Sequence, residues 1–238
     1  MKYVGSKNKI AKHILPIMLK DRKEGQWWVE PFVGGANMID KVTGNRIGAD
    51  FNGYLIALHE ALQDGWIPPD YVSEEEWKDV KVHMGDKYPK HYIAFVRIGC
   101  SFGADWNGGF ARNVKKDKPN AELLNKTTKS YCAQSKRNML KQVPHVRGVL
   151  FMNVSYDELD VPPNSIIYCD PPYEGTLGYK DEFNHNDFWT WCRMMWCEGH
   201  TVFVSEYNAP DDFTCVWEQE VSVNISSQGR RVERLFTL

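Results

Sequence analysis

The chain has 238 residues, of which 42% are hydrophobic and 25% are charged, and its formal net charge is −2. These values are ordinary for a globular protein of one large domain, or of one domain with an insert. No apolar run reaches 18 residues, and the first residues lack an apolar stretch. We therefore expect neither a membrane span nor a signal peptide.

The cysteines point to reduced thiols rather than to a disulfide framework. None of the six forms a CxxC pair, and no Cys/His cluster has the spacing of a zinc site. We expect a cytoplasmic protein without a bound metal.

The charges are unevenly distributed along the chain. Residues 1–23 carry seven Lys/Arg and one acid, and residues 112–147 carry ten Lys/Arg and two acids, whereas residues 151–220 carry two Lys/Arg and fourteen acids. Two basic segments in a chain of balanced charge favour a localised anion-binding surface, although solvated loop charges explain them equally well.

The first elements along the chain predict the opening of a doubly wound sheet. We expect strands at 26–30 and 46–50, a tight glycine loop at 31–35, and helices at 36–42 and 53–62. The loop lacks G-x-G-x-x-G and no G-K-[ST] follows, which argues against a dinucleotide or a phosphate loop. Asp50, sixteen residues after Gly34, is placed to accept hydrogen bonds from ribose hydroxyls. A ligand with ribose but without phosphates fits, and S-adenosylmethionine is such a ligand.

The sheet pattern is interrupted and then resumes. Pro68-Pro69 marks a break, and the chain to about Pro144 reads as helical patches, a loop rich in glycine and asparagine, and a lysine-rich stretch. Strands at 148–152, 165–169 and 200–205, a helix at 186–198 and a hairpin of 215–223 with 231–238 follow. We predict an α/β, Rossmann-like sheet with a C-terminal β-hairpin, formed by 1–62 and 145–238, with a mostly helical, loop-rich insert at 63–144.

The most informative motif is Asp170-Pro171-Pro172-Tyr173, directly after the apolar run 165–169. The prolines end the strand, so an acid, a rigid turn and an aromatic ring stand at the carboxyl end of a predicted parallel strand. Asp170 and the Pro171 carbonyl can accept both hydrogens of an exocyclic amine, and Tyr173 can stack on a base. A strand that ends in a proline turn with a solvated acid is the plain alternative.

The chain resembles the Dam-type, D12-class family of DNA N6-adenine methyltransferases, in the α-group motif order. The resemblance rests on four segments: 2–7 (KYVGSK), 30–35 (EPFVGG), 49–52 (ADFN) and 168–173 (YCDPPY). It implies a site-specific S-adenosylmethionine-dependent enzyme of a bacterial or phage-infected cell that methylates a flipped-out adenine in double-stranded DNA.

The resemblance also implies roles for individual residues. The catalytic residues would be Asp170, Pro171, Pro172 and Tyr173. The cofactor-binding residues would be Tyr3, Lys7, Glu30, Pro31, Phe32, Gly34, Gly35, Asp50, Phe51, Ser155, Tyr156 and Asp170. The family places its recognition hairpin near 99–113, so Arg112, Asn113, Lys115, Lys116 and Lys118 would contact DNA.

Several alternatives stay open. A cytosine N4 methyltransferase would share the mechanism, and a catalytically silent DNA-binding protein would share the fold. The sequence leaves open the recognition site, the oligomeric state, a monomer included, and whether the enzyme belongs to a restriction–modification pair, a phage or a solitary system.

Overall fold

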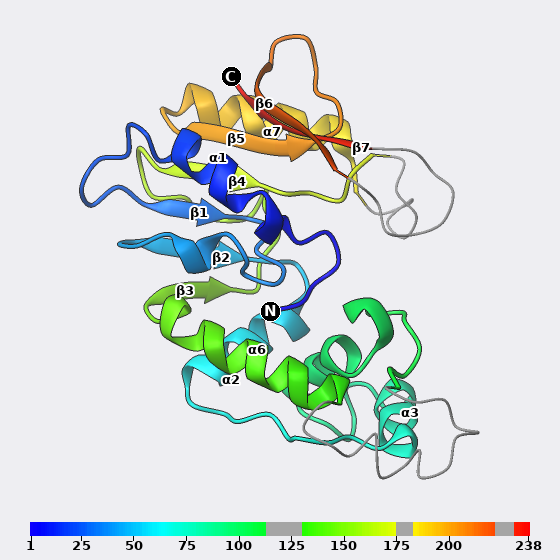
Figure 1. The fold of residues 1–238 in the computed structure, drawn as a ribbon. Coiled ribbons are helices and arrows are strands. Elements are labelled where there is room, and N and C mark those ends of the chain that lie inside the picture. The colour runs from blue at the N-terminus through cyan, green and yellow to red at the C-terminus, as the bar shows by residue number, and fades with distance from the viewer. Residues whose placement is uncertain (113–129, 175–182, 222–230) are drawn as a thin grey trace. The chain divides into compact units, whose positions relative to one another are not determined.

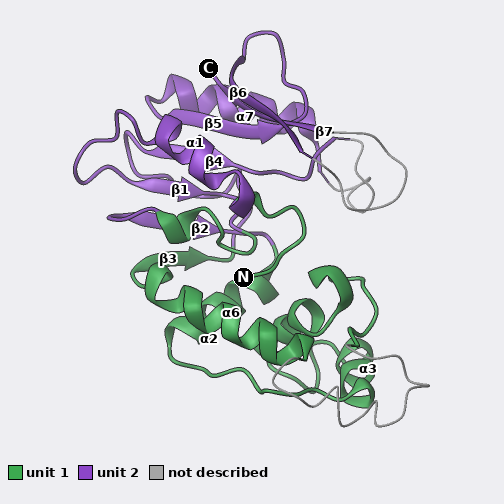
Figure 2. Ribbon diagram, viewed as in Figure 1, with its two compact units in different colours: residues 1–7, 34–41, 52–153 green, residues 8–33, 42–51, 154–238 purple. Residues whose placement is uncertain are grey.

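The computed structural model describes residues 1–112, 130–174, 183–221 and 231–238 (Figure 1). They form two compact units, each drawn from several stretches of chain (Figure 2). Unit 1 comprises residues 1–7, 34–41 and 52–153, and unit 2 comprises residues 8–33, 42–51 and 154–238. This division by contacts does not coincide with the domain boundaries expected from the sequence, which stay a prediction.

Unit 2 is organised by a sheet that is parallel at its centre and antiparallel at its end. Its strands are β1 (Trp28–Glu30), β2 (Arg46–Ala49), β4 (Ile166–Cys169), β5 (Thr201–Glu206), β6 (Thr214–Val221) and β7 (Arg231–Thr237). β1 pairs in parallel with β2 and β4, and β4 with β5, whereas β7 is antiparallel to β5 and β6. With β3 (Val149–Met152), the order is β3-β2-β1-β4-β5-β7-β6. The order reverses between β1 and β4, which makes the sheet doubly wound and confirms the predicted fold class and the C-terminal hairpin.

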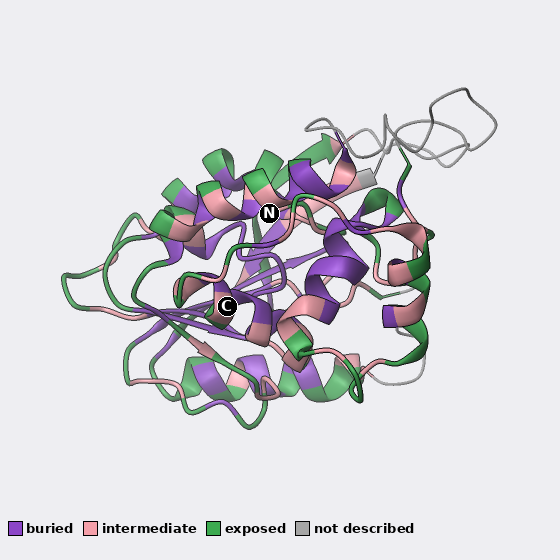
Figure 3. Ribbon diagram, turned by 90° about the horizontal axis from the view of Figure 1, so that it is seen from below, coloured by how far each residue is buried: buried purple, intermediate pink, exposed green. Residues whose placement is uncertain are grey.

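The central strands are buried along their whole length. Every residue of β1, β2 and β4 is buried, as expected for parallel strands covered on both faces (Figure 3). Helix α7 (His185–Cys197) contributes Phe188, Trp191 and Cys192 to the same core as Val29 and Ile167. The helix begins where the Asn184 side chain accepts the backbone N–H groups of residues 186 and 187. Unit 2 also contains α1 (Ala11–Met18).

Unit 1 is largely helical. Its helices are α2 (Gly53–Gln63), α3 (Glu74–Val82), α4 (Lys90–Ala94), the π-helix η3 (Phe95–Gly99), the 3₁₀ helix η4 (Phe102–Ala104) and α6 (Tyr131–Val146). Polar N-caps begin three of them, since Asn52, Ser73 and Ser130 each accept a backbone N–H from the first turn. Leu58, Phe95 and Met139, from α2, η3 and α6, share one apolar core.

The helix expected at 36–42 is wrong, because residue 36 is irregular and residues 37–38 form a turn before a short 3₁₀ helix, η2 (Ile39–Lys41). Ala36 has a φ of 53°, which an α-helix cannot contain. Tertiary hydrogen bonds hold the segment in this form, since Gln142 donates to the carbonyl of Ala36 at 2.8 Å. A second short 3₁₀ helix, η1, spans Lys7–Lys9. Among the described residues, none of the helices is long and apolar enough to cross a membrane.

Candidate active site

The carboxyl ends of the parallel strands of unit 2 carry four acids. Glu30 ends β1 and Glu206 ends β5, while Asp50 and Asp170 directly follow β2 and β4. The register aligns these ends, because Glu30 pairs with Gly48 and Cys169 pairs with Val204. The edge of a doubly wound sheet at its switch point is where such folds bind ligands.

The predicted catalytic motif leaves β4 at this edge. Asp170 is half-buried, Pro171 is buried and Tyr173 is half-buried. The Tyr173 hydroxyl donates to Glu233 of β7 at 3.0 Å, and its ring meets the ring of Tyr207 edge-on, with 4.6 Å between centroids. Burial, with the nearby Asp170 and Glu233 carboxylates, raises the pKa of Tyr173 well above its usual range, so the phenol stays neutral.

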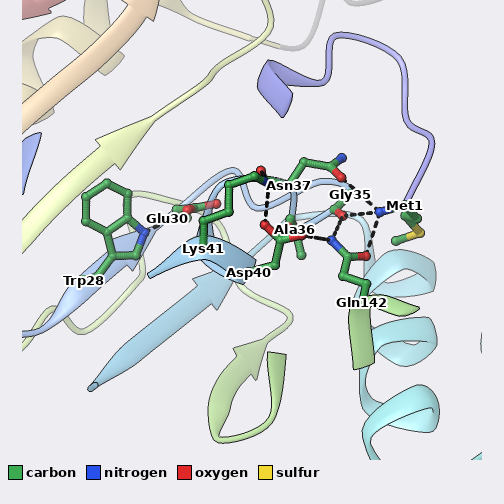
Figure 4. Close-up of polar contacts among 9 residues, drawn as sticks. All are labelled: Met1, Trp28, Glu30, Gly35, Ala36, Asn37, Asp40, Lys41 and Gln142. Atoms are coloured by element: carbon green, nitrogen blue, oxygen red, sulfur yellow. Dashed lines mark hydrogen bonds and ion pairs between the residues drawn. The ribbon is translucent and has the colours of Figure 1, made fainter. Parts of the chain in front are cut away.

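The other acids of this edge differ in exposure. Glu30 is 3% exposed, and its carboxylate accepts the indole N–H of Trp28 at 2.7 Å (Figure 4). Asp50 is half-buried, and Phe51 beside it is 80% exposed. An acid and an open aromatic ring therefore stand together after β2.

Two other predicted cofactor residues of unit 2 meet in an aromatic cluster. The rings of Phe32 and Tyr156 lie 5.4 Å apart, and both contact Phe188 of α7. Burial raises the pKa of Tyr156 to about 12. Pro31 is buried before Phe32, and the Ser155 hydroxyl donates to the Asp157 carboxylate. The motif after β1 and the segment 155–156 are thus brought together by packing.

Unit 1 holds the remaining predicted cofactor residues around the glycine loop. A Cβ at Gly34 would lie 2.8 Å from the Tyr3 ring, and one at Gly35 would lie 2.7 Å from the Tyr3 Cβ. Larger residues would displace Tyr3, so the close approach of backbone and ring requires glycine at both positions. Lys7 is buried, and its ammonium donates to the Gly5 carbonyl at 3.1 Å.

Side chains from two helices fix the carbonyls of this loop. A buried His59 nitrogen on α2 lies 2.8 Å from the Gly34 carbonyl, and burial lowers the histidine pKa to about 4. The Gln142 amide on α6 donates to the carbonyls of Gly35 and Ala36 at 3.1 and 2.8 Å (Figure 4). Since the imidazole is neutral, its Nε2–H is the donor to Gly34. Three successive carbonyls are therefore held by uncharged donors.

The predicted DNA-binding residues are only partly described. Arg112 forms an ion pair with Glu74 of α3 at 2.6 Å and lies over the Phe110 ring at 5.7 Å. Asn113, Lys115, Lys116 and Lys118 lie outside the described residues, and their roles stay predictions.

The structure adds residues that sequence reasoning missed. They are His59, Gln142, Glu206, Tyr207 and Glu233. None stands in a motif, and each joins the site through a contact between distant parts of its unit. The only local sequence signal for any of them is the position of Glu206 directly after a strand predicted to be buried. An acid at such a position is unusual, because acids are rarely fully buried.

The residues after β2 fit a nucleoside. The acid and the open ring there suit a ribose and an adenine. In the part of the chain that the structure describes, no group of three or more His, Cys, Asp or Glu side chains is arranged to hold a metal ion.

Comparisons with known proteins point the same way. Residues 3–93 match the family model of the D12 class N6 adenine-specific DNA methyltransferases. This segment includes Tyr3, the glycine loop and Asp50, whereas the motif at Asp170 lies beyond it.

One curated relative and two solved structures extend the comparison. The Type II methyltransferase M.FokI of Planomicrobium okeanokoites is 24% identical over 215 residues, which cover 82% of this chain and 32% of that protein. The chain thus spans about a third of that relative's length.

The solved structures are more distant. The "putative methylase HI0767" of Haemophilus influenzae has a TM-score of 0.35 and 10% identity over 96% of this chain and 87% of its own. SMU.472, a "putative methyltransferase" solved in complex with SAH, has a TM-score of 0.37 and 12% identity over 98% of this chain and 52% of its own. At these scores the fold assignment rests on the strand order.

Proposed function

We propose that the chain is an S-adenosylmethionine-dependent DNA methyltransferase that methylates the N6 amine of adenine at a specific site in duplex DNA. One observation carries the proposal: Asp170-Pro171-Pro172-Tyr173 leaves β4 beside the switch point of a doubly wound sheet, with the Asp50–Phe51 pair at the same edge. The family match over residues 3–93 supports adenine as the base.

The chemistry follows from the motif. An exocyclic amine is a poor nucleophile, because its lone pair is delocalised into the ring. The Asp170 carboxylate and the Pro171 carbonyl would accept its two N–H groups and draw the lone pair out of conjugation. The nitrogen would then accept the methyl group that S-adenosylmethionine would supply, and Asp170 would take up the proton that the amine loses.

The base would be held by stacking on Tyr173. An adenine inside a duplex cannot reach Asp170, so it would be flipped out, at a cost of roughly a few kcal/mol. Tyr173 is suited to this role because its ring is fixed by Tyr207 and its hydroxyl by Glu233. A fixed aromatic ring loses little conformational entropy when a base stacks on it.

We propose cofactor-binding residues within each unit, as the family resemblance implies. S-adenosylmethionine, when bound, supplies an electrophilic methyl group. Asp50 would accept hydrogen bonds from its ribose, Phe51 would cover its adenine, and Tyr3 with Gly34 and Gly35 would approach its methionine end. Lys7, Glu30, Pro31, Phe32, Ser155 and Tyr156 complete the set that we propose.

Double-stranded DNA would be bound by the basic stretch around Arg112. Ten Lys/Arg in residues 112–147 supply charge for phosphate contacts. We place the reaction in the cytoplasm of a bacterial or phage-infected cell, where duplex DNA is accessible.

The test is incubation of the purified protein with S-adenosylmethionine and unmethylated genomic DNA, followed by digestion to nucleosides and mass spectrometry. We expect N6-methyladenine, mapped to one short site by single-molecule sequencing, and no product from Asp170→Asn. N4-methylcytosine would instead identify the cytosine enzyme. Binding of DNA without any methylated base would identify a silent DNA-binding protein.

A further inference from the structure

A buried carboxylate at the end of β5 lies next to the proposed catalytic motif. Glu206 is the last residue of β5 and is 3% exposed. The register pairs Cys169 with Val204, so the residues that follow β4 run beside the end of β5. A carboxylate is rarely buried to this degree unless it has partners.

The partners of Glu206 are two backbone N–H groups on different loops. One carboxylate oxygen accepts the Tyr207 N–H at 2.7 Å, and the other accepts the Glu174 N–H at 3.2 Å. Glu174 directly follows Tyr173, and Tyr207 is the residue whose ring meets the Tyr173 ring. One side chain therefore ties the end of the catalytic turn to the loop that braces it.

We propose that Glu206 is a positioning residue that, in its ionised form, holds the Asp170–Tyr173 turn and the Tyr207 loop in one arrangement. The inference rests on the proposed function, since it concerns how Tyr173 is presented to the base. Hydrogen bonds to an ionised carboxylate are stronger than those between neutral groups, so the negative charge of Glu206 strengthens its hold on both segments.

Ionisation of this group is sensitive to pH near neutrality. Burial, together with the Asp170 and Glu174 carboxylates, raises the pKa of Glu206 to about 7, although the two backbone hydrogen bonds act to lower it. Arg234 lies opposite Glu206 on β7, but its guanidinium pairs with Glu218 at 3.1 Å and donates to the Tyr207 carbonyl. Among the described residues, the Glu233 carboxylate and the Tyr173 hydroxyl of the same turn are bonded to each other.

Protonation would weaken one of the two contacts. A protonated carboxyl carries a hydrogen on one oxygen, and that oxygen then faces a backbone N–H as a poor acceptor. The turn would be held at both points only above the pKa. We therefore expect kcat to rise about tenfold between pH 6 and pH 8, in proportion to the ionised fraction.

The first test compares Glu206→Gln with wild type and with Asp212→Asn, a control that removes an exposed acid of the same unit. Glutamine keeps the shape but offers one acceptor and no charge. We expect its kcat to stay at about the low-pH level of wild type across pH 6–8, with the KM for S-adenosylmethionine unchanged. Asp212→Asn should keep the wild-type profile. A Glu206→Gln enzyme with the wild-type kcat and pH profile would overturn the proposal.

The second test does not need activity. Amide hydrogen exchange measured by NMR should show faster exchange at Glu174 and Tyr207 in Glu206→Gln than in Asp212→Asn, once the intrinsic pH dependence is removed. Unchanged protection of both amides would refute the positioning role even in an active enzyme. If wild type transfers no methyl group yet these amides lose protection, the proposed function fails and the positioning role stands.

Discussion

The glycine loop of unit 1 and the turn after β4 of unit 2 are anchored in opposite ways. In unit 1, uncharged donors on His59 and Gln142 hold three backbone carbonyls. In unit 2, the carboxylates of Glu206 and Glu233 accept backbone N–H groups and a phenol. The first anchor works when its histidine is neutral, and the second works when its acid is charged.

Both working forms are the deprotonated ones, but the two pKa shifts change the free energy of unfolding with opposite signs. The pKa of His59 is lowered from 6.5 to about 4, so the unfolded chain binds more protons and stability is lost as pH falls between those values. The pKa of Glu206 is raised from 4.5 to about 7, so the folded chain binds more protons and stability is lost as pH rises between those values. Across its own pH range, each residue changes the free energy of unfolding by about 3 kcal/mol.

The largest expected effect comes from the turn itself. Asp170→Ala should abolish methyl transfer, because the amine loses its charged acceptor, while the fold stays intact. Transfer to genomic DNA is measured with labelled S-adenosylmethionine, and folding with circular dichroism. Near-normal methylation by Asp170→Ala would mean that the motif is only a strand-terminating turn.

Replacing either His59 or Glu206 should leave only the pH dependence of stability that the other residue causes. Glu206→Gln should remove the loss of stability between pH 4.5 and 7, leaving the rise that His59 causes between pH 4 and 6.5. His59→Gln, which keeps a donor for the Gly34 carbonyl, should do the reverse. The measurement is the free energy of unfolding from urea titrations across this pH range. If the free energy of unfolding changed with pH identically in both variants and wild type, neither residue would cause the expected pH dependence.

The effect at Asp50, which we propose as a cofactor contact, comes next in size. Asp50→Ala should weaken S-adenosylmethionine binding by roughly 1.5–3 kcal/mol, because ribose hydroxyls lose a charged acceptor. Calorimetry measures the affinity, and Asp212→Asn serves as the charge-matched control. An unaltered affinity would remove Asp50 from the cofactor site.

A smaller effect should separate the role of the Tyr173 hydroxyl from the role of its ring. Tyr173→Phe loses the bond to Glu233, worth roughly 0.5–1.5 kcal/mol, but keeps the ring. Tyr173→Ala also loses the stacking surface, worth roughly 1–3 kcal/mol. We expect kcat to fall in that order, measured at saturating DNA. Equal kcat in Tyr173→Phe and Tyr173→Ala would assign the role to the hydroxyl rather than to the ring.

The last effect concerns Arg112, whose ion pair with Glu74 gives a matched control. Arg112→Ala should relax discrimination at one base position by roughly 1–3 kcal/mol if the guanidinium reads a base edge. Glu74→Gln removes the same ion pair but keeps the arginine, so site preference should persist. Methylation of a site library compares the two variants. Equal changes of site preference in both variants would mean that Arg112 only stabilises unit 1 and does not read a base.

The local sequence determined the strands, the turn at Asp170 and the place of Asp50, because these features depend on apolar runs, proline and glycine at neighbouring positions. The doubly wound sheet and its hairpin follow from the order of those runs. The prediction of a helix at 36–42 was wrong because the structure of this segment depends on a residue far away in the sequence. Ala36 adopts a positive φ in a segment whose carbonyls bond to Gln142, more than 100 residues away.

The anchors of the site were decided only by the tertiary structure. His59, Gln142, Glu206 and Glu233 belong to no motif, and each acts through a contact with a residue distant in sequence. Their pKa values depend on burial and on neighbouring charges, which exist only in the folded chain. A sequence therefore predicts which groups would meet the substrate, whereas the fold decides which side chains hold those groups in place and at which pH.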